Sequence, residues 1–102
     1  EGKDGGRWVT FPNGTVKEMT RDGRVVVRFA NGDVKEDCGD GTVTYFYHEA
    51  KTTEISYPTG LVLTHFADNQ MEKAHPDGTR EIIFPNGKRV KFRADGTQLP
   101  IV

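Results

Sequence analysis

The sequence predicts an all-β fold: a single open, free-standing antiparallel meander sheet of about ten strands, each of 5–7 residues. Three observations lead to this prediction. Glycines preceded by Asp or Asn recur every nine residues, which marks regularly spaced hairpins. The segments between these glycines are rich in Val, Thr, Phe and Tyr, which favour strands. None of the segments shows a helical period, and all are too short to hold a crossover helix.

The turns of the first half follow one another at nine-residue intervals, at Gly5, Gly14, Gly23, Gly32 and Gly41. Asn-Gly and Asp-Gly are the preferred central pairs of a type I′ turn, so we expect two-residue hairpin loops. Nine residues minus two leave strands of up to seven residues. Because loops this short join each strand to the next, consecutive strands must pair antiparallel.

An irregular stretch at residues 48–52 interrupts the repeat, which then resumes with turns at Gly60, Gly78, Gly87 and Gly96. The turn without a glycine has Asp68 and Asn69 in its place, and Asn tolerates a positive φ better than most residues. A longer repeat of eighteen residues relates residues 13–29 to residues 31–47. The chain is therefore an internal repeat of one hairpin unit.

With two-residue loops, alternate residues of every strand share one side of the sheet, which we call predicted face A. It would gather seven aromatic residues and two carboxylates: Phe11, Phe29, Tyr45, Tyr47, Tyr57, Phe66, Phe84, Glu18 and Glu36. Predicted face B would be more polar and would place His65 between Glu54 and Glu72. Neither face is a clean core, so the sheet could close into a sandwich or barrel, dock on another domain, or stand alone. Regular repeats without corner-forming insertions favour the last.

Composition and charge exclude several classes of function. Fourteen basic and fifteen acidic side chains leave a net charge of -1, without the basic excess that a nucleic-acid binder needs. No apolar run is long enough to cross a membrane. The single cysteine, Cys38, cannot form an internal disulfide, which suits a reducing compartment such as the cytoplasm. Since the chain begins at Glu1, we expect residues 1–102 to be one domain cut from a larger protein.

The sequence contains no recognisable catalytic set, metal site or cofactor site. The three histidines do not combine with a nucleophile at a known spacing. Glu54, His65 and Glu72 suggest a metal site, but cross-strand pairing of exposed charges explains them better. The glycines lack the strand-to-helix context of a phosphate-binding loop. We therefore expect no enzyme activity and no cofactor.

Three kinds of interaction remain. Exposed aromatic rings with carboxylates between them would suit a peptide that contains proline and arginine, although the same rings would be an ordinary core under a second layer. An open meander also leaves two unpaired edges, through which copies could polymerise end to end. Binding of carbohydrate is the third hypothesis, and the scarcity of Gln and of Asn outside the turns disfavours it.

Several segments resemble the C-terminal glycine-box domain shared by T-complex protein 10 and CPAP (centromere protein J). They are the FPNG and HPDG turns, residues 25–36 (VVVRFANGDVKE), residues 45–61 (YFYHEAKTTEISYPTGL) and residues 65–87. The most specific part is the irregular turn, where Ala50, Thr52 and Thr53 precede Tyr57, Pro58, Gly60 and Leu61. The resemblance covers residues 8–97.

The resemblance implies a protein-interaction module of a centriole-assembly scaffold, located in the cytoplasm at the centriole or centrosome. In that family a free-standing sheet binds a short proline-containing motif of STIL-type centriole duplication proteins and self-associates end to end. The positions that match the family's partner-binding residues are Phe29, Tyr45, Phe66 and Glu72. Three of them lie on predicted face A, whereas Glu72 lies on predicted face B.

Predicted face A adds Tyr47, Phe11 and Glu36 to the expected contact residues. We therefore predict a module that binds the STIL-type motif on one exposed aromatic face of the sheet. The alternative is a structural element that polymerises end to end through its open edges.

Overall fold

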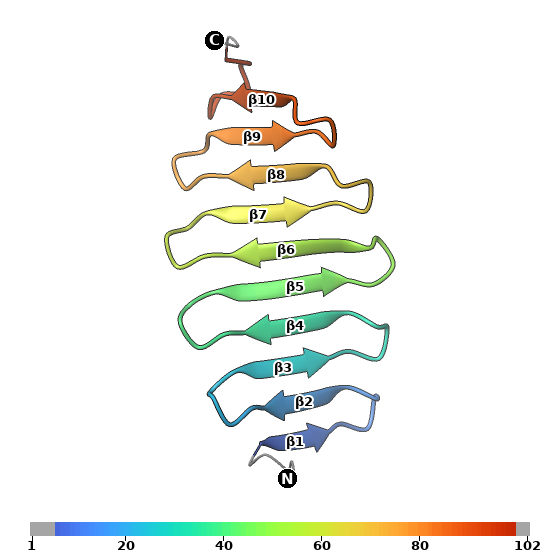
Figure 1. Cartoon of the computed structure of the whole chain (residues 1–102). Coiled ribbons are helices and arrows are strands. Elements are labelled where there is room, and N and C mark those ends of the chain that lie inside the picture. Colours follow the sequence, from blue (N-terminus) through green and yellow to red (C-terminus); the bar gives the residue numbers. More distant parts are fainter. Residues whose placement is uncertain (1–5, 100–102) are drawn as a thin grey trace.

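Ten antiparallel strands form one sheet, and their order in the sheet is their order in the chain (Figure 1). The computed structural model describes residues 6–99. The strands are β1 (Arg7–Thr10), β2 (Val16–Met19), β3 (Val25–Arg28), β4 (Val34–Asp37), β5 (Val43–Tyr47), β6 (Thr52–Ser56), β7 (Val62–His65), β8 (Met71–Ala74), β9 (Arg80–Ile83) and β10 (Arg89–Phe92). The predicted all-β meander is confirmed.

The turns are three-residue loops and not the predicted two-residue loops. In the first turn, the Phe11 N–H donates to the Thr15 carbonyl at 2.8 Å and the Gly14 N–H donates to the Phe11 carbonyl at 3.0 Å. Gly14 has a φ of 92°, whereas Asn13 is not among the residues with positive φ, although a type I′ turn requires positive φ at both. The loop Pro12, Asn13 and Gly14 is therefore a type I turn followed by a left-handed glycine.

The Asn or Asp before each glycine stabilises the loop through its side chain. Asn13 Oδ1 accepts the N–H of Thr15 at 3.0 Å. Equivalent bonds are accepted by Asn31, Asp40, Asp68, Asp77, Asn86 and Asp95. Such a bond closes an Asx turn and needs no positive φ at the Asx residue. Asn69 replaces a glycine in the left-handed position with a φ of 72°, as predicted.

Most strands are shorter than the predicted 5–7 residues, because a three-residue loop and its two closing residues occupy five of the nine residues in a regular repeat. Eight strands have four residues, and only β5 and β6 have five. Around the irregular stretch, Tyr47 pairs with Thr52, so that loop has four residues, and Lys51 adopts the left-handed conformation with a φ of 51°.

The additional loop residue shifts the register by one residue from the prediction. Glu18 lies opposite Trp8 and Val26, whereas two-residue loops would place it opposite Val9 and Val27. Because successive side chains alternate between the faces, a slip of one residue moves a whole strand's side chains to the other face. Residues of odd-numbered strands therefore share a face as predicted, and residues of even-numbered strands lie on the opposite face from the one predicted.

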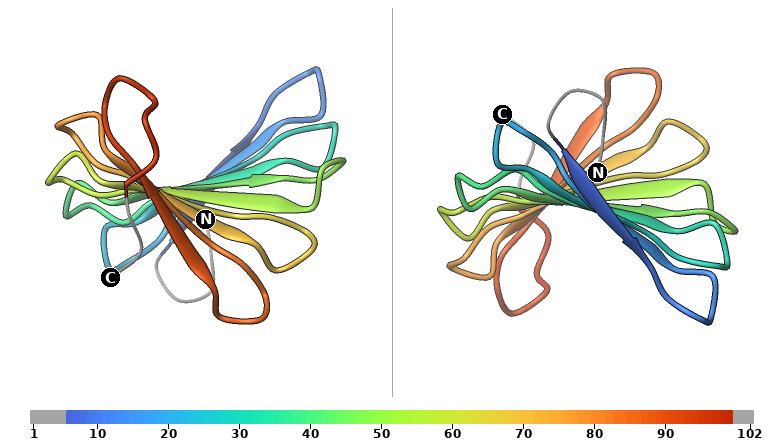
Figure 2. Two further views of the ribbon diagram at one scale, coloured as in Figure 1. Left: turned by 90° about the horizontal axis from the view of Figure 1, so that it is seen from above. Right: turned by 90° about the horizontal axis from the view of Figure 1, so that it is seen from below.

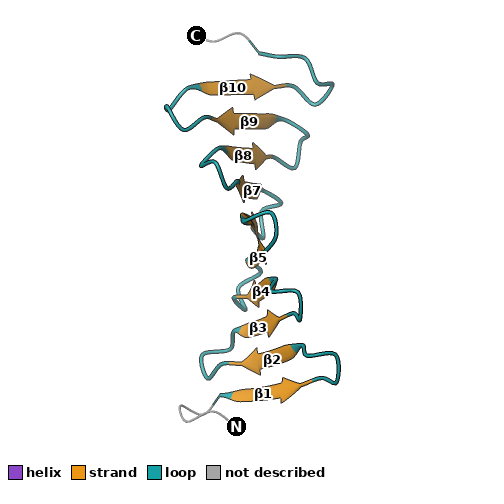
Figure 3. Cartoon of the chain, turned by 90° about the vertical axis from the view of Figure 1, so that its right-hand side faces the viewer, coloured by secondary structure: helices purple, strands orange, loops and turns teal. Residues whose placement is uncertain are grey.

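The sheet remains a single twisted layer. Within residues 6–99, strands are in contact only with their neighbours in the chain. Seen from either end, the strands fan out around a common axis (Figure 2), and the side view shows the middle strands edge-on and the terminal strands along their length (Figure 3). Val26 is the only hydrophobic residue of this region that is buried, and it remains 8% exposed. The chain thus forms neither a sandwich nor a barrel, and both of its faces are accessible.

The sheet has two margins, where the loops lie, and two edges, formed by its outermost strands. Along one margin, which we call the aromatic margin, the loops follow Phe11, Phe29, Tyr47, Phe66 and Phe84. β1 lies at one edge; at the other, Gln98 bridges Phe92 and the Leu99 N–H donates to the Lys91 carbonyl at 2.7 Å. Backbone pairing therefore extends beyond β10 by one bridge and one hydrogen bond. Over residues 6–99 there is no helix that could cross a membrane.

Candidate functional site

Seven aromatic side chains lie on one side of the sheet, which we call the aromatic face: Phe11, Phe29, Tyr45, Tyr47, Phe66, Phe84 and Phe92. Five of them directly precede the loops of the aromatic margin. Since strands that reach this margin are two apart, successive rings are spaced by roughly 10 Å. The common face predicted for Phe11, Phe29, Tyr45, Tyr47, Phe66 and Phe84 is confirmed. Two predictions are wrong: Tyr57 lies on the opposite side, and Phe92, predicted on face B, lies on the aromatic face.

Three of the rings, Phe29, Tyr45 and Tyr47, form a cluster near the middle of the aromatic face. The centroids of Phe29 and Tyr45 are 6.0 Å apart and the rings are stacked, and the centroids of Tyr45 and Tyr47 are 4.4 Å apart. Phe29 and Tyr45 are half-buried, whereas Tyr47 and Phe11 are exposed, at 38% and 43%. This single-layer sheet therefore leaves a run of aromatic surface accessible to a ligand.

Asp33 fixes the orientation of Tyr45. The Tyr45 hydroxyl donates to Asp33 Oδ2 at 2.8 Å, and the backbone N–H of His48 donates to Asp33 Oδ1 at 2.8 Å. The bond from His48 and then the bond from Tyr45 stabilise the charged carboxylate and lower the pKa of Asp33. The same bond to Asp33, together with desolvation, raises the pKa of Tyr45.

Glu72 lies on the aromatic face, so its predicted position on face B is wrong. It belongs to β8, an even-numbered strand, and lies opposite Thr64 and Ile82. Its Oε1 accepts the Arg80 Nε–H at 2.7 Å, and its side chain is 24% exposed. The register thus brings Glu72 to the same face as Phe29, Tyr45 and Phe66.

A row of charged residues, which the predicted register missed, crosses the same face beside the rings. Lys17, Lys35, Glu54 and Glu72 each occupy a different strand, and Lys35 and Glu54 lie directly opposite Tyr45 on its two sides. The prediction placed all four on face B, because it counted two loop residues. Pro12, Pro58, Pro76 and Pro85 could have revealed the third one, because proline favours the first central position of a type I turn.

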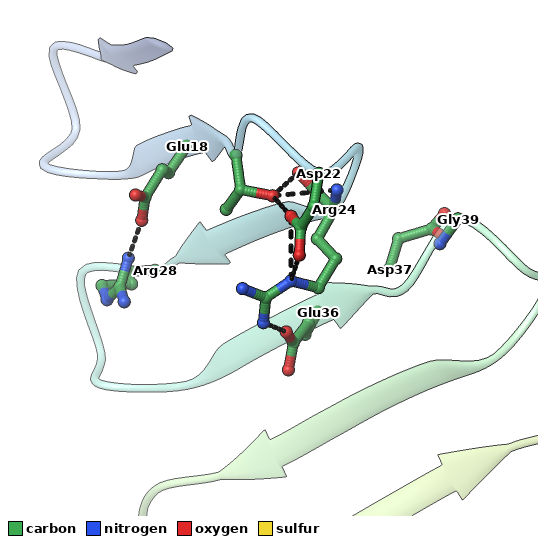
Figure 4. A network of polar contacts seen from close by, with 8 residues as sticks. Glu18, Asp22, Arg24, Arg28, Glu36, Asp37 and Gly39 are labelled. Atoms are coloured by element: carbon green, nitrogen blue, oxygen red, sulfur yellow. Dashed lines mark hydrogen bonds and ion pairs between the residues drawn. The ribbon is translucent and has the colours of Figure 1, made fainter. Parts of the chain in front are cut away.

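On the opposite side, which we call the ion-pair face, Glu18 and Glu36 pair with arginines of the neighbouring strand or its end (Figure 4). Arg28 Nη1 lies 3.2 Å from Glu18 Oε1, and Arg24 Nη1 lies 2.7 Å from Glu36 Oε1. Placing Glu18 and Glu36 among the aromatic rings was therefore wrong, because β2 and β4 are even-numbered strands. The Thr20 hydroxyl and Arg24 also hold the pKa of Asp22 below its usual value.

Glu81 is the buried carboxylate of the ion-pair face, at 7% exposure. Three cations surround it: Lys73 Nζ at 4.0 Å, Arg89 Nη1 at 3.9 Å and Lys91 Nζ at 3.8 Å. Because Lys73, Glu81 and Lys91 lie directly opposite one another on β8, β9 and β10, the cluster ties three strands together.

The described residues hold no group of three His, Cys, Asp or Glu side chains that could bind a metal ion. The predicted row of Glu54, His65 and Glu72 is wrong, because His65 lies opposite Thr53 and Met71 on the ion-pair face. Desolvation raises the pKa of the free thiol of Cys38, which disfavours the nucleophilic thiolate. The chemistry that the site offers is thus contact with aromatic rings and with unpaired charges.

Comparison with known proteins gives related sequences. The model of the T-complex protein 10 C-terminus family matches residues 3–36 and 58–91. The centrosomal P4.1-associated proteins of Mus musculus and Homo sapiens are 48% and 45% identical over 72 residues. The matches cover 70% of this chain but only 5% of each of these relatives.

Solved structures share both fold and sequence. The TCP10 domain of Danio rerio CPAP, in complex with a peptide of Danio rerio STIL, is 49% identical with a TM-score of 0.84, covering 94% of this chain and 54% of that chain. The TCP domain of Drosophila melanogaster SAS-4, in complex with a proline-rich motif of Ana2, is 35% identical with a TM-score of 0.78, covering 96% and 73%. The resemblance drawn from the glycine turns is confirmed: the chain belongs to the T-complex protein 10 C-terminus family.

Proposed function

We propose that this domain is a protein-interaction module of a centriole-assembly scaffold, without catalytic activity of its own. Its aromatic face would bind an extended, proline-containing segment of a STIL-type centriole duplication protein. The related domains of Danio rerio and Drosophila melanogaster are bound to peptides of STIL and Ana2, which supports this partner. The name of the curated relatives, centrosomal P4.1-associated protein, supports a location at the centriole or centrosome in the cytoplasm.

The observation that carries the proposal is the position of four residues on one uncovered face. Phe29, Tyr45, Phe66 and Glu72 come from four different strands or their ends, and the register turns all of them to the aromatic face. No second layer within residues 6–99 covers them. Exposed apolar patches rimmed by polar residues are typical of interaction sites.

The geometry suits a ligand that lies across the strands. Phe29 follows β3 and Phe66 follows β7, so four strand spacings, or roughly 19 Å, separate them. A polyproline II segment rises about 3.1 Å per residue, so about six residues would cover this distance. A peptide in this conformation loses little entropy on binding and packs its prolines against aromatic rings.

Each residue has a distinct role in the proposed peptide binding. Phe29, Tyr45 and Phe66 would be the anchors, and Phe11 and Tyr47 would extend the apolar contact along the margin. Glu72 would accept a hydrogen bond from a cationic side chain of the peptide. We leave Glu36 out of the contact surface, because it lies on the ion-pair face with Arg24.

Calorimetric titration with the Danio rerio STIL peptide tests the proposal. We expect Phe29→Ala and Phe66→Ala each to weaken binding by about 1–3 kcal/mol, as for truncated anchor residues. Tyr57→Ala is the matched control, because Tyr57 is also half-buried and also precedes a turn, but lies on the ion-pair face. Unchanged affinity in both Phe variants would end the proposal.

The alternative function, end-to-end polymerisation, is favoured by one observation: within residues 6–99 no strand lies beyond β1, and only Gln98 and Leu99 pair with the outer side of β10. Unpaired strand edges are templates for another chain. Light scattering over a range of concentrations checks this function. If the chain stays monomeric at high concentration, self-assembly through the edges is wrong.

A further inference from the structure

The charged row of the aromatic face is segregated by sign. Lys17 and Lys35 lie on β2 and β4, and Glu54 and Glu72 lie on β6 and β8. Tyr45 on β5 stands between the two pairs, directly opposite Lys35 on one side and Glu54 on the other. From β2 to β8, the row therefore consists of two lysines, the ring of Tyr45 and two glutamates.

Lys17 has no acidic residue directly opposite it on either neighbouring strand. It lies opposite Val9 on β1 and Val27 on β3, and the same-face residues of its own strand are Thr15 and Met19. It is half-buried and forms no ion pair within residues 6–99. A partly desolvated ammonium group without a carboxylate is an available site for an anion.

Lys35 has two acidic neighbours that are engaged elsewhere. Asp33 accepts bonds from the Tyr45 hydroxyl and the His48 backbone, and Asp37 Oδ1 accepts the Gly39 N–H at 2.9 Å. Neither forms an ion pair with Lys35 in the described part of the chain. Lys35 is therefore also open to an external carboxylate.

At the other end of the row, Glu54 lies opposite Tyr45 and Thr64, and no cation contacts it within residues 6–99. Glu72 pairs through Oε1 with Arg80, which is 52% exposed, and its second carboxylate oxygen forms no ion pair within residues 6–99. A cationic side chain could thus be accepted by Glu54 and Glu72 together.

A depression of about 310 Å³ marks the cationic end. Lys17, Lys35 and Asp37 surround it, with Val25 and Val27 between them. Val27 precedes Phe29 by two residues on the same face of β3, so the depression adjoins the Phe29–Tyr45 stack. A peptide that packs on these rings and continues toward β2 would pass over it.

We propose that the aromatic face admits its peptide in one orientation only, with acidic side chains over Lys17 and Lys35 and a basic side chain over Glu54 and Glu72. This inference rests on the proposed function and adds to it a requirement on the ligand: the proline-containing core must have flanks of opposite charge. Like charges placed opposite each other oppose the reverse orientation.

The spacing of the row sets the spacing of those charges. Tyr45 and Lys17 are three strands apart, as are Tyr45 and Glu72, which is roughly 14 Å in each direction. At about 3.1 Å per residue, this corresponds to four or five residues of polyproline II helix on each side. The acidic and basic flanks would therefore lie about four or five residues from the proline that contacts Tyr45.

Three synthetic peptides test the proposal by calorimetry. All contain the proline-containing core of the Danio rerio STIL peptide; one has two Asp before and two Lys after it, one has these flanks exchanged, and one has neutral flanks. We expect one charged arrangement to bind about tenfold more tightly than its exchange at low salt, with a smaller ratio as salt screens the charges.

A charge-reversed domain supplies the matched comparison. The double variant Lys17→Glu with Lys35→Glu should abolish or invert the preference. The control Arg21→Glu with Arg93→Glu changes the net charge equally at exposed residues outside the aromatic face, and should keep it. A nitroxide on the acidic end of the preferred peptide should broaden NMR signals of β1–β3 more than those of β8–β10.

Two results overturn the proposal and are distinguishable. Equal affinities for both charged peptides, while the neutral peptide still binds and Phe66→Ala still weakens it, would refute the single orientation and leave the proposed function intact. If none of the three peptides binds the wild-type domain, the proposed function itself fails, and the orientation proposal fails with it.

Discussion

On the ion-pair face, Glu18, Glu36 and Glu81 each contact an arginine or lysine, whereas on the aromatic face Lys17, Lys35 and Glu54 contact no opposite charge within residues 6–99. The difference has a physical meaning. A single-layer sheet buries little apolar surface, so cross-strand pairs provide much of its stability. The ion-pair face supplies most of these pairs, whereas on the aromatic face only Glu72 and Arg80 form an ion pair within residues 6–99.

Packing follows the same division. Val26, the buried hydrophobic residue, lies on the ion-pair face opposite Glu18 and Glu36. The ion pairs that Glu18 and Glu36 form with Arg28 and Arg24 lie on its two sides (Figure 4). Long charged side chains can cover apolar surface with their aliphatic parts. The ion-pair face therefore protects the few apolar residues that this fold buries.

The largest expected contrast comes from two adjacent residues of β5 that point to opposite faces. Tyr45→Ala should weaken binding of the STIL peptide by about 1–3 kcal/mol, because it removes an anchor ring. Phe46→Ala should leave the affinity unchanged and lower the free energy of unfolding, because Phe46 packs between Val34 and Thr53. Calorimetry and urea unfolding of both variants measure the two effects. Loss of affinity in Phe46→Ala would break the division between the faces.

A second comparison concerns two carboxylates. Glu81→Gln should lower the free energy of unfolding by about 1–2 kcal/mol, because it leaves three cations without their common anion and two of them are well exposed. Glu54→Gln should change it by less than about 0.5 kcal/mol, because the half-buried Glu54 forms no ion pair within residues 6–99. Equal effects in urea unfolding would show that the charges of the aromatic face also stabilise the fold.

The smallest expected effect is the loss of folding stability at acidic pH. The pKa values of Asp33 beside Tyr45 and of Asp22 beside Arg24 are lowered from 3.8 in the folded chain. Protonation therefore favours the unfolded chain: the stabilisation is complete above 3.8 and is lost as the pH falls through the lower folded values. In an NMR titration, Tyr45 signals should follow Asp33. Asp33→Asn should remove the change in the Tyr45 signals. The change in the Arg24 signals, which reports protonation of Asp22, should remain.

The sequence was sufficient for the fold because every repeat contains the same local signal. Glycine, or Asn69, provides the left-handed residue of each regular turn, and the residues between them favour strands. The register was harder, since it depends on whether Pro12 belongs to the strand or to the loop. Counting Pro12 in the strand gave the wrong face to all even-numbered strands.

The same error in register placed some of the predicted site residues on the correct face and others on the wrong one. Phe29, Tyr45 and Phe66 belong to odd-numbered strands or their ends, so their common face was predicted correctly. Glu36 and Glu72 belong to β4 and β8, and both were placed on the wrong face. Lys17 and Lys35 could not be recognised from the sequence, because their lack of partners depends on Asp33 and Asp37 being occupied by other donors.

The restriction of contacts to neighbouring strands also shapes how the domain comes apart. In such a linear array, stability is close to a sum over adjacent pairs, so fraying begins at the termini and proceeds strand by strand. Amide hydrogens of β5 and β6 should then exchange more slowly than those of β1 and β10. A ligand that lies across several consecutive strands would hold them together, and would slow amide hydrogen exchange in all of the strands that it crosses.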